Sequence, residues 1–260
     1  MTDTKDNRTK RQNPLFITSL QRGIKILEAF DSNARSLSLS DLVKITGLNL
    51  SAVQRFLHTW EALGYLEKNL ITKRFDLTPK VMCLGYNYLK GQRLVEIATP
   101  ILLDARKRIG NAVYLGTLYE TDIIYLIRLP QRFLMLESTL PGRSVPAFCG
   151  GRAILSCLPE QEVEDLLRRS AITKITPFTI LDIQDNMKEV AKARKLGYAI
   201  SVQEQLIGEI SISAAVTDSA GKPVAAVYIS ANLSEWTPDQ VVEKLVPVAL
   251  EVAGAIGAQF

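Results

Sequence analysis

The first third of the chain alternates short apolar-periodic segments with polar breaks. Apolar residues recur at helical spacing from Ile17 to Phe30, and the polar cluster from Asp31 to Ser38 then predicts a loop. A second short helix is expected next, with Ser40 as its N-cap and Gly47 supplying a left-handed position at its end. These breaks predict three short helices, the last of which starts near Ser51.

The third helix is followed by a hairpin. The segment from Ser51 to Gln54 fits a capping box, and the apolar stripe of this helix is Val53, Phe56, Leu57, Trp60 and Leu63. Two short strands, 65–67 and 75–77, flank a polar tip that runs from Lys68 to Arg74. The order helix, helix, turn, helix, hairpin predicts a winged helix-turn-helix, although a plain three-helix bundle with a solvated face has the same helical pattern.

The polar face of the third helix suits DNA. Arg55 can pair with guanine and Gln54 with adenine in the major groove, whereas Ser51, Lys73 and Arg74 suit phosphates, which position a protein without reading sequence. The candidate DNA contacts, taken together, are small, hydrogen-bonding or cationic: Arg22, Ser40, Asn49, Ser51, Ala52, Gln54, Arg55, His58, Thr59, Lys68, Lys73 and Arg74.

The remainder of the chain mixes helices and strands. Two helical patterns over 80–109 break near 90–92. Strands are expected at 112–119, 122–129, 134–137, 198–202, 209–216 and 224–230, and helices at 151–158, 160–169 and 183–196, with a last helix capped by Thr237 and running to about 259. Strands flanked by helices predict an α+β domain with an antiparallel sheet.

Composition and charge narrow the function. The chain has 260 residues, is 47% hydrophobic and carries a net charge of +4, which excludes a disordered protein. Residues 1–90 hold 14 Lys and Arg against 8 Asp and Glu, while the rest is slightly acidic, so a polyanion is expected to meet the first part. A basic tail alone is the competing explanation, since excluding residues 1–13 leaves ten against six.

Several classes of protein are not expected. No apolar run is long enough to span a membrane, the start of the chain has no signal-peptide core, and three scattered cysteines suit a reducing cytoplasm. The single histidine, His58, lies on the proposed recognition helix, and Glu204 has no visible partner as a general base. We therefore expect no metal, no cofactor and no enzyme activity.

Motif order and spacing resemble one family. The residues that carry the likeness are Ser19–Leu27, Leu50–Leu57, Leu63–Leu66, Phe75–Pro79, Leu84-Gly85, Val145–Leu155, Leu196–Tyr198 and Pro223–Ser230. Over residues 17–258 the chain resembles the IclR family of bacterial transcriptional regulators. Two departures are Ala52, where members often have Thr, and the run 203–208, where acids are more usual.

The resemblance implies a domain plan and a mode of action. It divides the chain into a tail (1–14), a winged helix-turn-helix (15–79), a linker helix used in dimerisation (80–92) and a GAF-like α/β effector-binding domain (93–260). Such a regulator binds operator DNA as a homodimer or homotetramer and represses or activates under control of an organic or aromatic acid. A ligand sensor that acts through protein partners without DNA is the alternative.

The effector site has its own candidates. Cys149, Gly150 and Gly151 precede an expected helix, where backbone N–H groups can approach an anion. Strand alternation puts Ser211 with Ser213, and Tyr228 with Ser230, on single faces, although these faces could also be solvated. The resemblance carries pocket positions onto Cys149, Gly150, Ser201, Ser211, Tyr228 and Ser230, and Phe133, Met135 and Phe148 could add an apolar wall.

Overall fold

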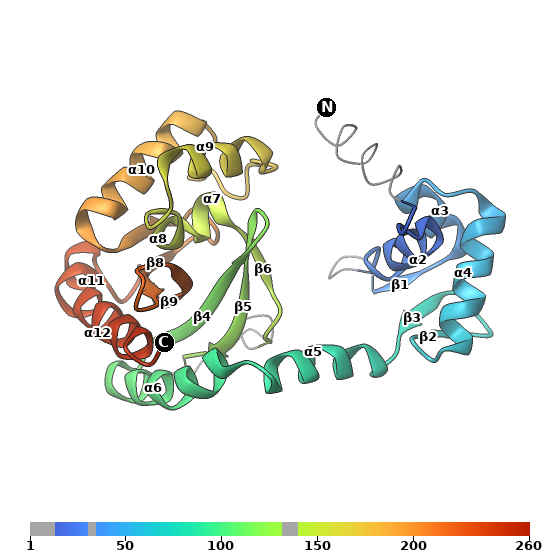
Figure 1. Ribbon diagram of the computed structural model, residues 1–260, viewed down its shortest axis with the longest axis horizontal. Helices are drawn as coiled ribbons and strands as arrows, with labels where there is room; N and C mark the ends of the chain where they lie inside the picture. Colours follow the sequence, from blue (N-terminus) through green and yellow to red (C-terminus); the bar gives the residue numbers. More distant parts are fainter. Residues whose placement is uncertain (1–13, 31–34, 132–139) are drawn as a thin grey trace. The chain divides into compact units, whose positions relative to one another are not determined.

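The computed structural model describes residues 14–30, 35–131 and 140–260 (Figure 1). They divide into two compact units, which meet in the sequence between Tyr88 and Leu89, inside the expected linker. The expected strand at 134–137 and the expected wall residues Phe133 and Met135 lie outside the described residues. Each unit is described by itself below.

The first unit is a winged helix-turn-helix. It contains helices α2 (Thr18–Leu27), α3 (Leu39–Thr46) and α4 (Leu50–Ala62) and a small antiparallel sheet with the order β1-β3-β2. Strands β2 (Leu66–Lys68) and β3 (Phe75–Leu77) form the predicted hairpin. Strand β1 (Ser36–Leu37) was missed, because two residues inside a polar loop are too short to show a period of two.

Both expected helix caps in this unit were placed wrongly. The N-cap of α3 is Ser38 rather than Ser40, and Ser38 forms a capping box with Asp41. The N-cap of α4 is Asn49 rather than Ser51, and its side chain accepts from the backbone N–H of Ala52 at 2.8 Å. Each helix therefore has its N-cap two positions before the predicted one, because the side-chain oxygen of an earlier residue accepts from a backbone N–H of the first turn.

The core of this unit is small and leaves apolar side chains outside. Val53 and Leu57 of α4 pack with Ile26 and Leu42, whereas Leu63, expected in the stripe, is 48% exposed because it follows the last turn of α4. The α2 stripe also differs from a core stripe. Its exposed apolar side chains are Ile17, Leu20 and Ile24.

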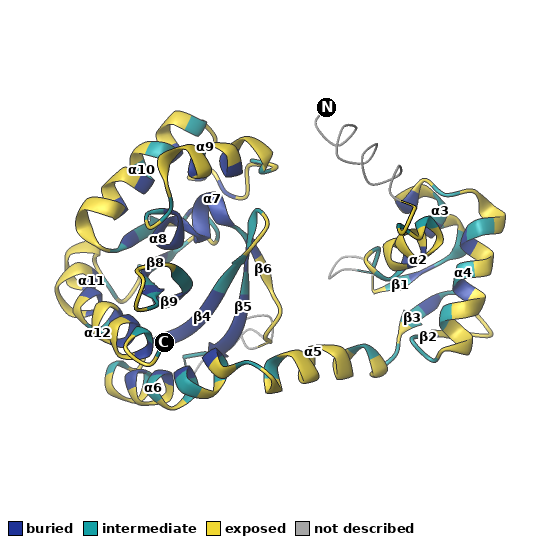
Figure 2. Ribbon diagram, in the orientation of Figure 1, coloured by how far each residue is buried: buried dark blue, intermediate teal, exposed yellow. Residues whose placement is uncertain are grey.

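Residues 80–109 form two helices, as predicted. Helix α5 (Lys80–Lys90) has no buried residue, and Figure 2 shows it exposed along most of its length. Helix α6 (Arg93–Ile109) is amphipathic, buries Leu94, Ala98, Leu102 and Ala105, and ends at Gly110 in the left-handed conformation. The break between them spans Gly91-Gln92, where the sequence pattern also breaks.

A six-stranded antiparallel sheet with the order β6-β5-β4-β9-β8-β7 forms the second unit. Its strands are β4 (Ala112–Tyr119), β5 (Asp122–Leu129), β6 (Ser144–Pro146), β7 (Ala199–Val202), β8 (Glu209–Thr217) and β9 (Pro223–Asn232). The expected α/β domain with an antiparallel sheet is confirmed. Strand β6 was missed, because three residues around a proline carry no alternation.

Helices cover both faces of this sheet and make two separate cores (Figure 1). One face packs on α6, α11 (Pro238–Lys244) and α12 (Val246–Gly257), through side chains such as Val113, Ile212 and Val227. The other packs on α7 (Ala147–Gly150), α8 (Arg152–Leu155), α9 (Glu160–Arg169) and α10 (Ile183–Leu196). Alternation along each strand assigns its residues to one core or the other.

Two expected helices differ from the prediction. The helix expected at 151–158 is the shorter α8, and the four-residue helix α7 just before it was not predicted. The final helix has the predicted cap, since Thr237 and Gln240 form a capping box, but it breaks at Leu245. Pro247 explains this break, because it has no N–H to continue the α11 ladder. None of the helices described is long and apolar enough to cross a membrane.

Candidate functional site

Helix α4 is held by one face and open on the other. The left-handed Gly47 ends α3, with φ of 66°, and the chain enters α4 two residues later. Val53 and Leu57 are buried, and the indole N–H of Trp60 donates to the carbonyl of Gly23 in α2 at 2.8 Å. These anchors fix the rotation of α4 about its axis, so the direction of its opposite face is also fixed.

That opposite face carries the predicted DNA contacts. Ser51, Gln54, Arg55, His58 and Thr59 are all exposed, and Ala52 is half-buried. The Thr59 hydroxyl donates to the carbonyl of Arg55 at 2.9 Å, and Ser51 donates to the Asn49 side chain at 3.0 Å. Among the other candidates, Arg22 on α2, Ser40 on α3 and the cap Asn49 are exposed.

Hydrogen bonds within the hairpin fix the conformation of its tip. One of the three cations predicted to contact DNA from the hairpin, Arg74, is bonded to other parts of the first unit instead. Asn69 accepts from the backbone N–H groups of Ile71 and Thr72, and Lys73 takes a positive φ of 56°. Lys68 and Lys73 are exposed. Arg74, in contrast, donates to the Ser36 carbonyl and to Asp41, which ties β3 to β1 and α3.

In the second unit, the serines predicted to share a strand face all lie on the same face of the sheet. Ser201, Ser211 and Ser230 lie side by side on β7, β8 and β9, and Ser213 and Tyr228 form the neighbouring row. All of them lie on the face that packs on α7 to α10, so the solvated interpretation is wrong for Ser213 and Ser230, which are 7% and 8% exposed. Ser201 and Ser211 are half-buried.

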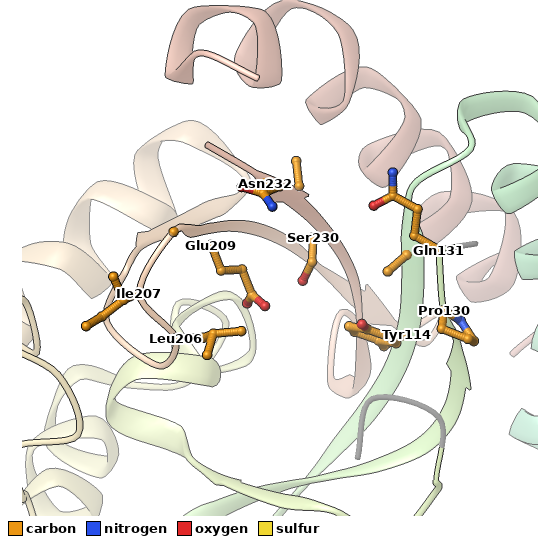
Figure 3. A pocket seen from close by; sticks show the side chains of 11 residues that line it. Tyr114, Pro130, Gln131, Leu206, Ile207, Glu209, Ser230 and Asn232 are labelled. Carbon is orange, nitrogen blue, oxygen red and sulfur yellow. The ribbon is translucent and has the colours of Figure 1, made fainter. Parts of the chain in front are cut away.

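A cavity of about 180 Å³ opens at one end of this face (Figure 3). Its walls come from β4, from the residues after β5, from the loop before β8, and from β9. The lining residues are Ala112, Tyr114, Pro130, Gln131, Leu206, Ile207, Gly208, Glu209, Ser230, Ala231 and Asn232. Of the six predicted effector contacts, only Ser230 lines this cavity.

The polar groups of the cavity centre on one carboxylate. Figure 3 shows the Glu209 side chain directed into the space between Leu206, Ser230 and Tyr114. Burial raises the pKa of Glu209 above its usual value, while Arg143, a hydrogen bond with Ser230, and Arg128 oppose the rise. The Arg128 guanidinium lies over the rings of Tyr114 and Tyr125, with its carbon 4.8 and 5.2 Å from the ring centroids.

Three of the predicted effector contacts, Cys149, Gly150 and Tyr228, are buried in the core on this face of the sheet. Cys149 is 3% exposed, and burial raises the pKa of its thiol to about 12. Tyr228 is fully buried, with its ring edge-on to Tyr125, and its hydroxyl has no hydrogen-bond partner in the described part of the chain. Burial raises the Tyr228 pKa well above its usual value, and Tyr125 and Cys149 add to the rise.

The segment Cys149-Gly150-Gly151 directly precedes the short helix α8, as expected, but its first two residues also form the end of another short helix, α7. Cys149 and Gly150 lie inside the four-residue helix α7, and Gly150 is buried. A Cβ at Gly150 would come within 2.8 Å of Val145 Cγ2 and 3.1 Å of Gln205 Nε2. Gly150 is therefore needed for close packing against β6 and the 203–208 loop.

Glu204, expected to be unpaired, has a buried partner. Arg152 of α8 is 2% exposed and donates to both Glu204 oxygens, at 2.5 and 2.7 Å, and to Asn186 at 3.0 Å. The backbone carbonyl of Glu204 also accepts from the hydroxyl of Thr179 at 2.9 Å. These bonds hold the loop before β8 in place, and residues 206–209, which follow Glu204, line the cavity.

Sequence reasoning missed the two side chains that give the cavity its polarity. Glu209 shares the alternation of Ser211 and Ser213, so extending that pattern by one step would have found it. Tyr114 is directly opposite Tyr228 in the sheet, and this register is not readable from one sequence. Among the described residues, no group of three His, Cys, Asp or Glu is placed to hold a metal ion.

Comparison with known proteins agrees with this architecture. The IclR helix-turn-helix domain model matches residues 19–70, and the bacterial transcriptional regulator IclR C-terminal model matches residues 86–258. The chain is 29% identical to the Pca regulon regulatory protein of Pseudomonas putida, over 91% of this chain and 82% of that protein.

Solved structures share the fold. A transcriptional regulator from Rhodococcus sp. RHA1 is 30% identical with a TM-score of 0.77, covering 93% of this chain and 97% of that chain. An IclR homologue from Microbacterium hydrocarbonoxydans, solved in complex with 4-hydroxybenzoate, is 20% identical with a TM-score of 0.73, covering 92% and 97%.

A winged helix-turn-helix joined to an α/β unit with a polar cavity defines a ligand-controlled DNA-binding regulator. The family models match both units in order and together span most of the chain. The chain belongs to the IclR family of bacterial transcriptional regulators. Its first unit contains the helix-turn-helix domain of the family, and its second corresponds to the family's C-terminal domain.

Proposed function

We propose that α4 reads operator DNA with Gln54 and Arg55, and that Lys68 and Lys73 of the hairpin contact the backbone. The observation that supports this assignment is the division of α4 into a buried face and an exposed face. Val53, Leu57 and the Trp60 hydrogen bond hold one face, and the exposed face presents side chains that pair with base edges. Arg74 is reassigned to bracing the hairpin, because its donors are engaged by Ser36 and Asp41.

Replacing Arg55 with Ala tests this assignment against operator DNA selected from a random library. We expect a loss of about 1–3 kcal/mol on the selected site and a smaller loss on unrelated DNA, because base contacts carry specificity. Arg169→Ala, an exposed arginine of α9, is the matched control and should bind as the wild type does. Equal loss on both DNAs would make Arg55 a phosphate contact, and binding insensitive to salt would refute DNA recognition through cations.

We further propose that the protein binds DNA as a dimer or as a dimer of dimers. The support is the apolar surface of the first unit: Ile17 and Leu20 on α2 are 62% and 59% exposed, and Met82 and Leu84 on α5 are 67% and 59% exposed. A groove of about 520 Å³ runs along the α2 part of this surface. Exposed apolar area on this scale suits a second copy of the chain.

Sedimentation equilibrium of Leu20→Glu and Met82→Glu tests the dimer. Each charge should shift the mass toward the monomer and weaken operator binding, because a two-fold dimer grips two half-sites. Leu250→Glu, at an apolar residue of α12 that is 41% exposed, is the matched control. An unchanged mass for both variants would contradict the assignment of this surface.

The effector, in our proposal, is a small organic or aromatic acid held in the cavity beside Ser230. The cavity of about 180 Å³ has roughly the liquid volume of six waters, which suits a compact acid better than a ligand that needs 300–1,000 Å³. The homologue solved with 4-hydroxybenzoate supports this class of ligand. Calorimetry against a panel of such acids, with operator affinity measured at saturation, tests the proposal.

Binding should change operator affinity by about 5- to 150-fold, the usual range of coupling between two sites. An acid that saturates the protein without changing operator affinity would refute control by this cavity. We propose no chemical reaction for the chain. Its one histidine, His58, lies exposed on α4, and the relatives found by comparison are transcriptional regulators.

A further inference from the structure

The cavity contains a group that an acid-binding site does not ordinarily need. Of the lining residues the structure describes, Glu209 is the only one with an ionisable carboxyl group, and its neighbours in the wall are apolar or neutral. Figure 3 shows this side chain turned inward from the start of β8, toward Ser230 and Tyr114. A carboxylate accepts hydrogen bonds through both oxygens and donates none.

Among the residues that the structure describes, the neighbours of Glu209 satisfy only part of this capacity. Ser230, on the neighbouring strand, supplies one hydrogen bond, and the cations Arg128 from β5 and Arg143 ahead of β6 attract the carboxylate. Asn232 is opposite Glu209 in the sheet and is exposed, and Tyr114 lies across the cavity. A half-buried carboxylate with this environment favours a hydrogen-bond donor in the space it faces.

An acid effector cannot place its own carboxylate there at low cost. Two like charges within a few ångströms in a partly buried site repel, and one of them must then take up a proton. The apolar wall of Leu206, Ile207 and Pro130 suits the hydrocarbon part of a ligand. The ligand is thereby oriented with its acid group away from Glu209 and a different, donating group toward it.

We propose that Glu209 is a specificity-determining residue that accepts a hydrogen bond from a hydroxyl group of the effector, so that the effector is a hydroxy acid and not a plain acid or a diacid. This inference rests on the proposed function of the cavity and adds to it how the cavity distinguishes a hydroxy acid from other acids. Burial supports it in a second way, since it raises the pKa of Glu209 and makes any unpaired carboxylate there costly.

The experiment uses full-length protein and size-matched probes. Calorimetry and operator release are measured with 4-hydroxybenzoate, 4-methylbenzoate, benzoate and terephthalate, and with the aliphatic pair 3-hydroxybutyrate and butyrate. The methyl compound has nearly the size of the hydroxyl compound but no donor. The variants are Glu209→Leu, which removes the acceptor, and Glu209→Gln, which keeps the shape. Glu162→Gln, at an exposed position of α9, is the control.

We expect the wild type and the control to prefer the hydroxylated member of a pair by about 10- to 150-fold, the range of a hydrogen bond to a charged group. Glu209→Leu should lower this preference below about 3-fold and bind 4-methylbenzoate more tightly than the wild type. Glu209→Gln should bind terephthalate better than the wild type, because the repelling charge is gone.

Three results would overturn the proposal, and the first two differ in whether the proposed effector cavity also fails. If the acids bind and release operator DNA but the wild type does not distinguish hydroxyl from methyl, Glu209 does not select a donor, and the effector cavity itself stands. If no acid of the panel binds or affects operator affinity, the acid-binding function of the cavity fails along with the selection by Glu209. A preference that survives in Glu209→Leu also refutes the role of this residue.

Discussion

The buried pair of Arg152 and Glu204 makes a sharp prediction about stability. Their side chains are 2% and 6% exposed, and two hydrogen bonds join them. Replacing Glu204 with Gln keeps the size of the side chain but leaves a buried guanidinium without its counter-charge. Removal of one partner of such a pair costs about 3–5 kcal/mol, since the remaining charge stays desolvated. For a domain of this size, that loss lowers the melting temperature by about 6–20 °C.

Tryptophan fluorescence can follow the second unit alone. The chain has two tryptophans, Trp60 in the first unit and Trp236 in the second, so a Trp60→Phe background leaves one reporter. Urea unfolding in that background gives the free energy of unfolding for Glu204→Gln and for the double variant Arg152→Met with Glu204→Leu. The double variant should regain most of the loss, because neither charge remains buried.

A second ion pair in the same unit provides the control. Arg168 and Glu164 on α9 are paired at 2.5 Å, but their side chains are 60% and 29% exposed. Glu164→Gln should change the free energy of unfolding by less than about 1 kcal/mol, since water screens such pairs. If Glu204→Gln costs no more than Glu164→Gln, the argument from burial is wrong.

Three further predictions follow from caps, burial and titration. Asn49→Ala should cost about 1 kcal/mol of unfolding free energy in the first unit, and Ser51→Ala clearly less, since Asn49 is the cap of α4; equal losses in thermal melts without DNA would return the cap to Ser51. Iodoacetamide at pH 8 should label the two exposed cysteines of the native chain and leave Cys149, whose thiol pKa is raised to about 12, for the unfolded state; mass spectrometry of native protein with three labels would contradict this. Because burial raises the folded-state pKa of Glu209, its protonation stabilises the fold below the unfolded-state pKa, and that gain is lost as the pH rises through the raised value. Urea midpoints of the wild type should therefore fall relative to Glu209→Gln over that interval, and parallel curves would refute it.

Sequence reasoning gave the order of elements because the periodic signals here are long. Helix α10, with 14 residues, and the strands β4 and β5, with eight residues each, were predicted to the residue, since runs of this length leave little ambiguity. The short strands β1 and β6 were not predicted, because two or three residues are too few to show a period. Strand β1 has two residues and β6 has three, and their pairing depends on a partner strand distant in sequence.

The site was predicted in part. Alternation correctly put Ser211 and Ser213 on one face, and Tyr228 and Ser230 on one face, because that property is local to a strand. It could not show that loop 203–208 folds over the sheet, since a buried ion pair fixes the loop and its two charges are 52 positions apart. The cap errors have a similar cause: Ser40 and Ser51 have the right chemistry, and only the backbone angles single out Ser38 and Asn49.

The segregation of side chains between the two sheet faces has an evolutionary consequence. Along β8 and β9, side chains that face α7 to α10 alternate with side chains that pack on α6 and α12, and most of the cavity residues on these strands belong to the first set; Ala231 belongs to the second set and also touches the cavity. A substitution at Ser230 can therefore change ligand choice while Ile229, on the opposite face, continues to pack in the other core. Regulators built this way can acquire new chemical signals through single replacements without redesigning the machinery that transmits them.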